Sequence, residues 1–123
     1  MSEEKKKRFT KRGLPASVRL AVEASLGKKA EELCVLDLRE LSSFTDFFLV
    51  MHGNSSRQNA AVAEAIEAAL KPAGLRPLSV EGRESADWVL LDYGSLVVHV
   101  FSRAAREHYA LEKLWGDAPR LDF

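Results

Sequence analysis

A β-hairpin decides the fold of this chain, and it is encoded by WVLLDYGSLVVHVF at residues 88–101. Two apolar runs rich in strand-forming residues flank the polar residues 92–95, where Gly94 can supply the positive φ of a turn. We expect Leu91 to pair with Leu96 across this turn. One face of the hairpin is then uniformly apolar and belongs to the core: Val89, Leu91, Leu96, Val98 and Val100.

The opposite face of the hairpin combines large apolar side chains with polar ones. In this register Trp88 faces His99, and Leu90 faces Val97. Four acidic residues flank this face: Glu81, Glu84, Asp87 and Asp92. Because Trp is enriched among the anchors of protein interfaces, the face is typical of an exposed partner-binding patch. An equally good alternative places Trp88 in the core beneath the last helix. His99 has no catalytic partner at a recognisable spacing, so we expect it to be structural.

The chain on either side of the hairpin predicts helices and further strands. Apolar residues repeat at helical spacing after Pro15, after a Ser55 or Ser56 N-cap, and around residues 109–115. Residues 33–38, 47–52 and 76–81 are expected to be strands, which gives the order αββαβββα. The predicted fold class is α/β (α+β), a single domain with one mixed sheet of about five strands flanked by helices. Its expected bounds are residues 14–118, between a disordered basic tail at 1–13 and a C-terminal tail at 119–123.

Composition agrees with one globular domain. Of the 123 residues, 46% are hydrophobic and 29% are charged, with 7 Gly and 4 Pro. The apolar runs fall far short of the roughly 18 residues that a membrane span requires, and no secretory signal follows Met1. We therefore expect a cytoplasmic protein without a membrane segment. The one cysteine, Cys34, lies in an apolar run and is expected to be a buried free thiol.

The formal net charge of zero hides an uneven distribution. Residues 1–12 hold six of the 18 basic residues and two of the 18 acidic ones, so the rest of the chain carries a net charge of −4. A basic tail can contact RNA phosphates while an acidic body meets a basic protein. The alternative is a solvated tail with no specific partner. The basic residues in question are Lys5, Lys6, Lys7, Arg8, Lys11 and Arg12.

The clearest enzymatic signal is the turn Gly53-Asn54-Ser55-Ser56 between a predicted strand and helix. It resembles the phosphate-binding turn of nucleotidyltransferases. Those enzymes need paired carboxylates to hold magnesium, whereas Asp37, Asp46 and Asp92 stand singly. Cys34 and the three histidines show no metal-ligand spacing. We therefore predict a capped helix start here, and no catalytic residue, cofactor or metal.

Six segments in the same order resemble the ribosomal silencing factor (Iojap) family. They are LSSFTDFF at 41–48, HGNSSRQ at 52–58, VEG at 80–82, ADWVLLDYG at 86–94, VHVF at 98–101 and YALEKLW at 109–115. The similarity runs from about Val18 to Trp115. It implies a nucleotidyltransferase-like fold without the catalytic carboxylates, and no enzymatic activity. It also implies binding to the large ribosomal subunit through the ribosomal protein numbered fourteen, which blocks joining of the small subunit when nutrients run low.

The resemblance also implies where partners bind. The family motif matches at Trp88, Asp92 and His99, and an acidic patch suits a basic ribosomal protein. The expected partner-binding residues are Glu81, Asp87, Trp88, Leu90, Asp92, Tyr93, Val97 and His99. The basic tail lies outside the resemblance; contact of its basic residues with rRNA, and a homodimer through the hairpin patch, are further hypotheses from the residues themselves. Assembly of the large subunit is an alternative function, and a nucleotidyltransferase-like enzyme is a more remote one.

Overall fold

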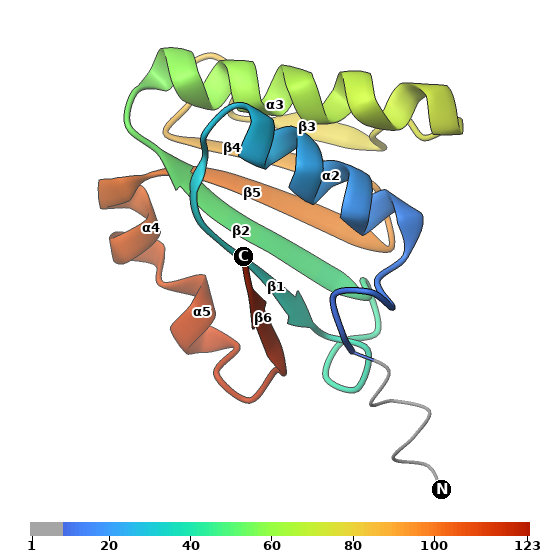
Figure 1. The fold of residues 1–123 in the computed structure, drawn as a ribbon. Coiled ribbons are helices and arrows are strands. Elements are labelled where there is room, and N and C mark those ends of the chain that lie inside the picture. The colour runs from blue at the N-terminus through green and yellow to red at the C-terminus, as the bar shows by residue number, and fades with distance from the viewer. Residues whose placement is uncertain (1–8) are drawn as a thin grey trace, which may run out of the picture.

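The computed structural model describes residues 9–123 and is built around a six-stranded mixed sheet (Figure 1). The strands lie in the order β3-β4-β5-β2-β1-β6, and every neighbouring pair is antiparallel except β2 and β5, which are parallel. Their bounds are β1 Glu31–Asp37, β2 Phe47–Gly53, β3 Ser79–Glu81, β4 Trp88–Asp92, β5 Leu96–Ser102 and β6 Arg120–Asp122. The predicted α/β (α+β) class with a mixed sheet is confirmed, with one strand more than expected.

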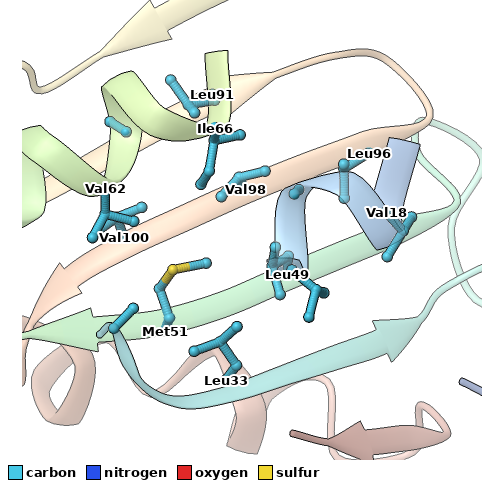
Figure 2. Packing of buried hydrophobic residues seen from close by; sticks show 14 of the residues in the cluster. Val18, Leu33, Leu49, Met51, Val62, Ile66, Leu91, Leu96, Val98 and Val100 are labelled. Carbon is cyan, nitrogen blue, oxygen red and sulfur yellow. The ribbon is translucent and has the colours of Figure 1, made fainter. Parts of the chain in front are cut away.

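Two long helices cover one face of the sheet. They are α2 (Ala16–Gly27) and α3 (Ser56–Leu70), and a 3-10 turn, η1 (Lys71–Ala73), follows α3. Their apolar stripes pack against Leu49, Met51 and the other inward residues of the strands (Figure 2). Burying one such side chain contributes about 1.5 to 3 kcal/mol. We call the cluster of these residues the main core; its buried members include Val18, Val22, Leu49, Met51, Val62, Ile66, Leu70, Leu91, Val98 and Val100.

Two short helices lie on the other face, opposite α2 and α3 (Figure 1). They are α4 (Arg103–Tyr109), which contacts β5 and β2, and α5 (Leu111–Leu114). Beneath them lies a smaller cluster, which we call the second core: Cys34, Leu36, Leu38, Phe48, Val50, Val97, Phe101 and Ala118. Cys34 is a buried free thiol, as expected, and burial raises its pKa to about 11. Trp88 and Leu90 pack at the margin of this cluster and stay partly exposed.

The register of the hairpin differs from the prediction by two residues. Leu91 pairs with Val98 instead of Leu96, because Tyr93 N donates to Leu96 O and closes a connection of only two residues. Gly94 has the expected positive φ, 88°. A shift of two residues keeps every side chain on its own face. The apolar face is therefore as predicted, and all five of its residues are buried.

The last helix and both ends of the chain also differ from the prediction. Ala110 takes a left-handed conformation, φ 47°, and divides the expected helix around 109–115 into α4 and α5. The expected C-terminal tail contains β6, which pairs with β1. Of the expected disordered tail, residues 1–8 lie outside the described residues, whereas Phe9 stacks on Phe47 with ring centroids 6.2 Å apart. The strand expected at residues 76–81 is present as β3 but is shorter, covering only Ser79–Glu81.

Candidate partner-binding surface

Trp88 lies between the sheet and α4. Its indole ring centroid is 4.9 Å from that of Phe101 on β5 and 4.5 Å from that of Tyr109 on α4. Its Nε1 donates to His99 Nδ1 at 3.1 Å. Because the indole is also partly exposed, Trp88 combines the two alternatives that the sequence left open. Part of the ring packs at the second core, and part faces solvent.

His99 is a buried support beneath Trp88. It is only 3% exposed, and its ring meets that of Phe48 edge-on at 4.4 Å. Burial lowers the pKa of His99 to about 3, so the imidazole is neutral at physiological pH. Because Nδ1 accepts the indole N–H, the remaining proton is assigned to Nε2. Nε2 has no hydrogen-bond partner among the described residues. The expected structural role of His99 agrees with this geometry.

The structure brings together only some of the residues that the sequence put in the binding patch. Glu81 pairs with Leu90 across β3 and β4, and Asp87 is exposed beside Trp88. Asp92 lies on the same face of β4, but its carboxylate accepts from Gly94 N at 2.8 Å and caps the turn. These positions form one partly exposed surface at the β3–β4 end of the sheet.

Two other predicted residues lie apart from this surface, one buried and one on the other face of the sheet. Val97 is buried in the second core. Tyr93 packs against the main core on the opposite face, its hydroxyl is buried, and burial raises its pKa to about 12. Of the eight predicted residues, Val97 and His99 are buried, and Tyr93 is partly exposed on the opposite face.

The structure adds Tyr109, which the sequence did not indicate as a binding residue. Tyr109 lies against Trp88 and is 50% exposed, so it extends the apolar surface onto α4. The sequence placed it inside one continuous helix, where it would have joined the apolar stripe. We define the candidate docking surface as Glu81, Asp87, Trp88, Leu90 and Tyr109. Leu114 on α5 is a further exposed apolar residue, 72% exposed.

A buried ionic cluster holds α4 and α5 together. Arg106 is 7% exposed and donates twice to the Glu112 carboxylate, from Nε to Oε1 at 3.1 Å and from Nη2 to Oε2 at 2.8 Å. Its Nη1 lies 3.0 Å from His52 Nδ1. Glu112 also pairs with Arg120 of β6 at 3.3 Å. The hydrogen bonds from Arg106 lower the pKa of Glu112. This pair spans the break at Ala110 and so joins α5 to α4.

The glycine–serine turn after β2 is occupied by its own side chains. Ser55 Oγ accepts from Gln58 N at 3.0 Å, which confirms the predicted N-cap. Gln58 Oε1 accepts from Asn54 N at 2.7 Å, and Gln58 Nε2 donates to the carbonyls of Lys28 and Lys29. The backbone N–H groups of Asn54 and Gln58, which could otherwise bind a phosphate, thus already donate to side chains of the turn. Across residues 9–123, no group of three His, Cys, Asp or Glu side chains could hold a metal ion.

This chain is similar to known proteins in both sequence and fold. The model of the family described as ribosomal silencing factor during starvation matches residues 11–123. A Halalkalibacterium halodurans protein named ribosomal silencing factor RsfS is 45% identical over 105 residues, which are 85% of this chain and 90% of that protein. A crystal structure of a Chromobacterium violaceum protein has a TM-score of 0.79 at 40% identity, covering 81% of this chain and 83% of that one.

A more distant relative is longer than this chain. The mouse protein named mitochondrial assembly of ribosomal large subunit protein 1 is 32% identical over 91 residues. Those residues are 72% of this chain and 40% of the mouse protein. Its name concerns assembly of the large subunit, whereas the bacterial names concern silencing.

Proposed function

This chain belongs to the ribosomal silencing factor family, and on that premise we propose that it binds the large ribosomal subunit through the ribosomal protein numbered fourteen. We propose further that the bound protein lies where the two subunits meet, so that the small subunit cannot join and translation is repressed when nutrients are limiting. The observation that carries this proposal is the candidate docking surface. It presents Trp88, Leu90 and Tyr109 together, with the carboxylates of Glu81 and Asp87 at its margin.

The chemistry of this surface suits a basic protein partner. A tryptophan packed against other aromatic rings offers a large, rigid contact area, as interface anchors do. Carboxylates around such an anchor attract basic side chains and speed association. The net charge of −4 on residues 13–123 acts in the same direction. The apolar centre would supply affinity, and the acidic margin would select the partner.

Blocking by occupancy requires no catalytic group. Added protein should therefore reduce the fraction of joined ribosomes in proportion to the fraction of large subunits that it occupies. We would titrate it against a fixed mixture of purified subunits and measure joined particles by sucrose-gradient sedimentation. We expect the effect to saturate near one protein per large subunit. If a small fraction of that amount dissociated all the ribosomes, occupancy would be excluded as the mechanism.

Co-sedimentation with separated subunits tests the partner directly. We expect the protein to pellet with the large subunit and to stay in the supernatant with the small one. Binding to the isolated ribosomal protein numbered fourteen should compete with pelleting. Pelleting with the small subunit alone would contradict the proposal.

Assembly of the large subunit is a second candidate function, favoured by the name of the mouse relative. Both roles use a surface that binds the large subunit. They differ in when the protein acts. Loss of an assembly factor should cause precursor particles to accumulate during growth, whereas loss of a silencing factor alone should leave mature large subunits normal and change only their joining during starvation.

Three further parts of the proposal concern the rest of the chain. We propose that it acts in the cytoplasm, where its ribosomal partner lies. Among residues 9–123, no helix has the length and apolar character that crossing a membrane requires.

A homodimer through the docking surface would compete with ribosome binding. The proposed rRNA contacts involve Lys5 to Arg8, outside the described residues, with Lys11 and Arg12. The Lys11 ammonium already lies 4.6 Å from the ring centre of Phe123.

A further inference from the structure

The indole N–H of Trp88 is bonded inside the protein, although part of the ring is exposed. Trp has one polar atom, and that atom can only donate. Here it donates to His99 Nδ1 at 3.1 Å. His99 is the cross-strand partner of Leu90, so it lies diagonal to Trp88, within reach of a long aromatic side chain. The hydrogen bond therefore fixes which edge of the indole points into the protein and which edge points out.

His99 is itself held firmly enough to orient a neighbour. The imidazole meets Phe48 edge-on at 4.4 Å and lies nearly parallel to Phe101, with an interplanar angle of 11° and centroids 6.0 Å apart. It is 3% exposed, so water does not compete for Nδ1. Burial also disfavours protonation, which keeps Nδ1 available as an acceptor. Trp88 thus has a rigid acceptor at its N–H edge, and the neighbouring rings of Phe101 and Tyr109 both pack against the indole at a tilt.

We propose that His99 is a positioning residue for the docking surface: it does not touch the partner, but orients the indole of Trp88 so that its exposed edge is preset for binding. This inference rests on the proposed function. It differs from a role for His99 as an interface contact, because a side chain this buried does not itself reach a partner. It also differs from simple filling of the second core, because core filling needs no acceptor atom.

The matched variants His99→Asn and His99→Leu separate these roles. Asn and Leu have nearly the same shape, and both leave space where the imidazole was. Only Asn keeps an acceptor near the place of Nδ1. Their stabilities relative to the parent show the cost of lost packing. The difference between the two combines the hydrogen bond with the burial of the Asn NH2 group, so it must be compared with the same difference where the indole donor is absent. Repeating the pair in a Trp88→Phe background, which has no donor, completes a double-mutant cycle.

The first measurement is the indole N–H resonance of Trp88, assigned by its loss in Trp88→Phe. In the parent and in His99→Asn, we expect this proton to exchange slowly with solvent. In His99→Leu, we expect fast exchange and a shifted resonance. Equal exchange rates in the two His99 variants would overturn the inference, because the acceptor would then make no difference to the indole.

The second measurement is affinity for purified large ribosomal subunits. We expect His99→Leu to bind roughly three- to tenfold more weakly than His99→Asn, the range that one hydrogen bond contributes. That difference should vanish in the Trp88→Phe background. If Trp88→Ala weakens binding but the two His99 variants bind equally, this inference fails and the docking surface stands. If Trp88→Ala binds as tightly as the parent, the proposed surface fails and the inference fails with it.

Discussion

The two faces of the sheet are covered in different ways. On one face, α2 and α3 have 12 and 15 residues, and their inward side chains are almost all apolar and fully buried. On the other face, α4 and α5 have seven and four residues, and the cluster beneath them combines partly exposed aromatic rings with buried charge. Helices this short are not stable alone. The first face holds the fold together, and the second can carry a binding surface because its covering is small and partly open.

The comparison also separates two kinds of stabilisation. The main core depends on apolar area, which tolerates changes of charge and pH. The second face depends on one ion pair across the break at Ala110, and on aromatic contacts that leave ring edges exposed. Substitutions on the first face should therefore change the free energy of unfolding, and substitutions on the second should change binding or local opening.

The largest effect should come from Ile66→Ala in the main core. Ile66 is fully buried on α3, so the loss of its side chain leaves a cavity and should lower the free energy of unfolding by about 3 to 4 kcal/mol. The free energy of unfolding is measured by denaturant titration. Affinity for the large subunit, per folded molecule, should stay at the parent value. The exposed Glu64→Ala on the same helix is the control and should change neither quantity. A large loss of affinity in folded Ile66→Ala would break the separation between the faces.

The next effect should come from Arg106→Gln, which leaves Glu112 without its main partner. Removing one member of a buried ion pair costs about 3 to 5 kcal/mol. We expect the free energy that keeps α4 and α5 closed to fall by about 2 to 3 kcal/mol, because Glu112 keeps some exposure and its contact with Arg120. Hydrogen exchange should speed up in α4 and α5 but not in α3. Arg103→Gln, an exposed neighbour on α4, should leave exchange unchanged. Uniform acceleration over the whole chain would show that the two faces open together.

The same variant should change the response to acid. Arg106 lowers the pKa of Glu112 in the folded state below its usual value of 4.5. A lowered folded pKa contributes stability above the unfolded pKa, and this contribution is lost as the pH falls through the folded pKa. The parent should therefore lose stability below about pH 4.5 more steeply than Arg106→Gln. Parallel pH profiles would mean that the pair contributes nothing to folding.

Trp88→Ala should affect binding more than folding. Truncation of an interface anchor costs about 2 kcal/mol or more, which is roughly thirtyfold in Kd. The free energy of unfolding should fall by less, because the indole is only partly buried. Trp115→Ala is the matched control. Trp115 also packs at the second core, where its ring meets that of Phe48, but it lies outside the docking surface. A loss of 3 to 5 kcal/mol in stability, with binding falling only through unfolding, would assign Trp88 to the core.

The smallest effect should come from the basic tail. Phe9 stacks on Phe47 in the main core, so the tail joins the body away from the docking surface. If it contacts rRNA, replacing Lys5, Lys6, Lys7 and Arg8 by Ser should weaken binding to whole subunits at low salt and flatten its salt dependence. Binding to the isolated ribosomal protein should not change. An unaltered salt slope would leave the tail without a nucleic-acid role.

The sequence predicted well what depends on periodicity and poorly what depends on short local geometry. The faces of the hairpin were correct because alternation survives a shift of two residues, whereas the register depended on the length of the turn at Gly94. The strand β6 has three residues, two of them charged, and gives no periodic signal. The break at Ala110 involves neither Gly nor Pro. The predicted register already put His99 beside Trp88, directly opposite rather than diagonal as in the structure, but the pattern of residues did not indicate the hydrogen bond between them.

The parallel pairing of β2 with β5 bears on how the chain folds. Residues 47–53 and 96–102 meet at the centre of the sheet, although α3, β3 and β4 separate them in the chain. The pairs on either side of this seam are antiparallel: β1 with β2, and β3, β4 and β5 in succession, are local in the chain, whereas β6 reaches β1 from the C-terminal end. Distant contacts cost more chain entropy, so we expect the seam to form after these local pairs and, together with the β1–β6 pair, to limit the rate. Conservative truncations at Leu49 and Val98 should then have φ values well below those at the β4–β5 turn, and the hairpin that carries the docking surface would be structured before the domain closes.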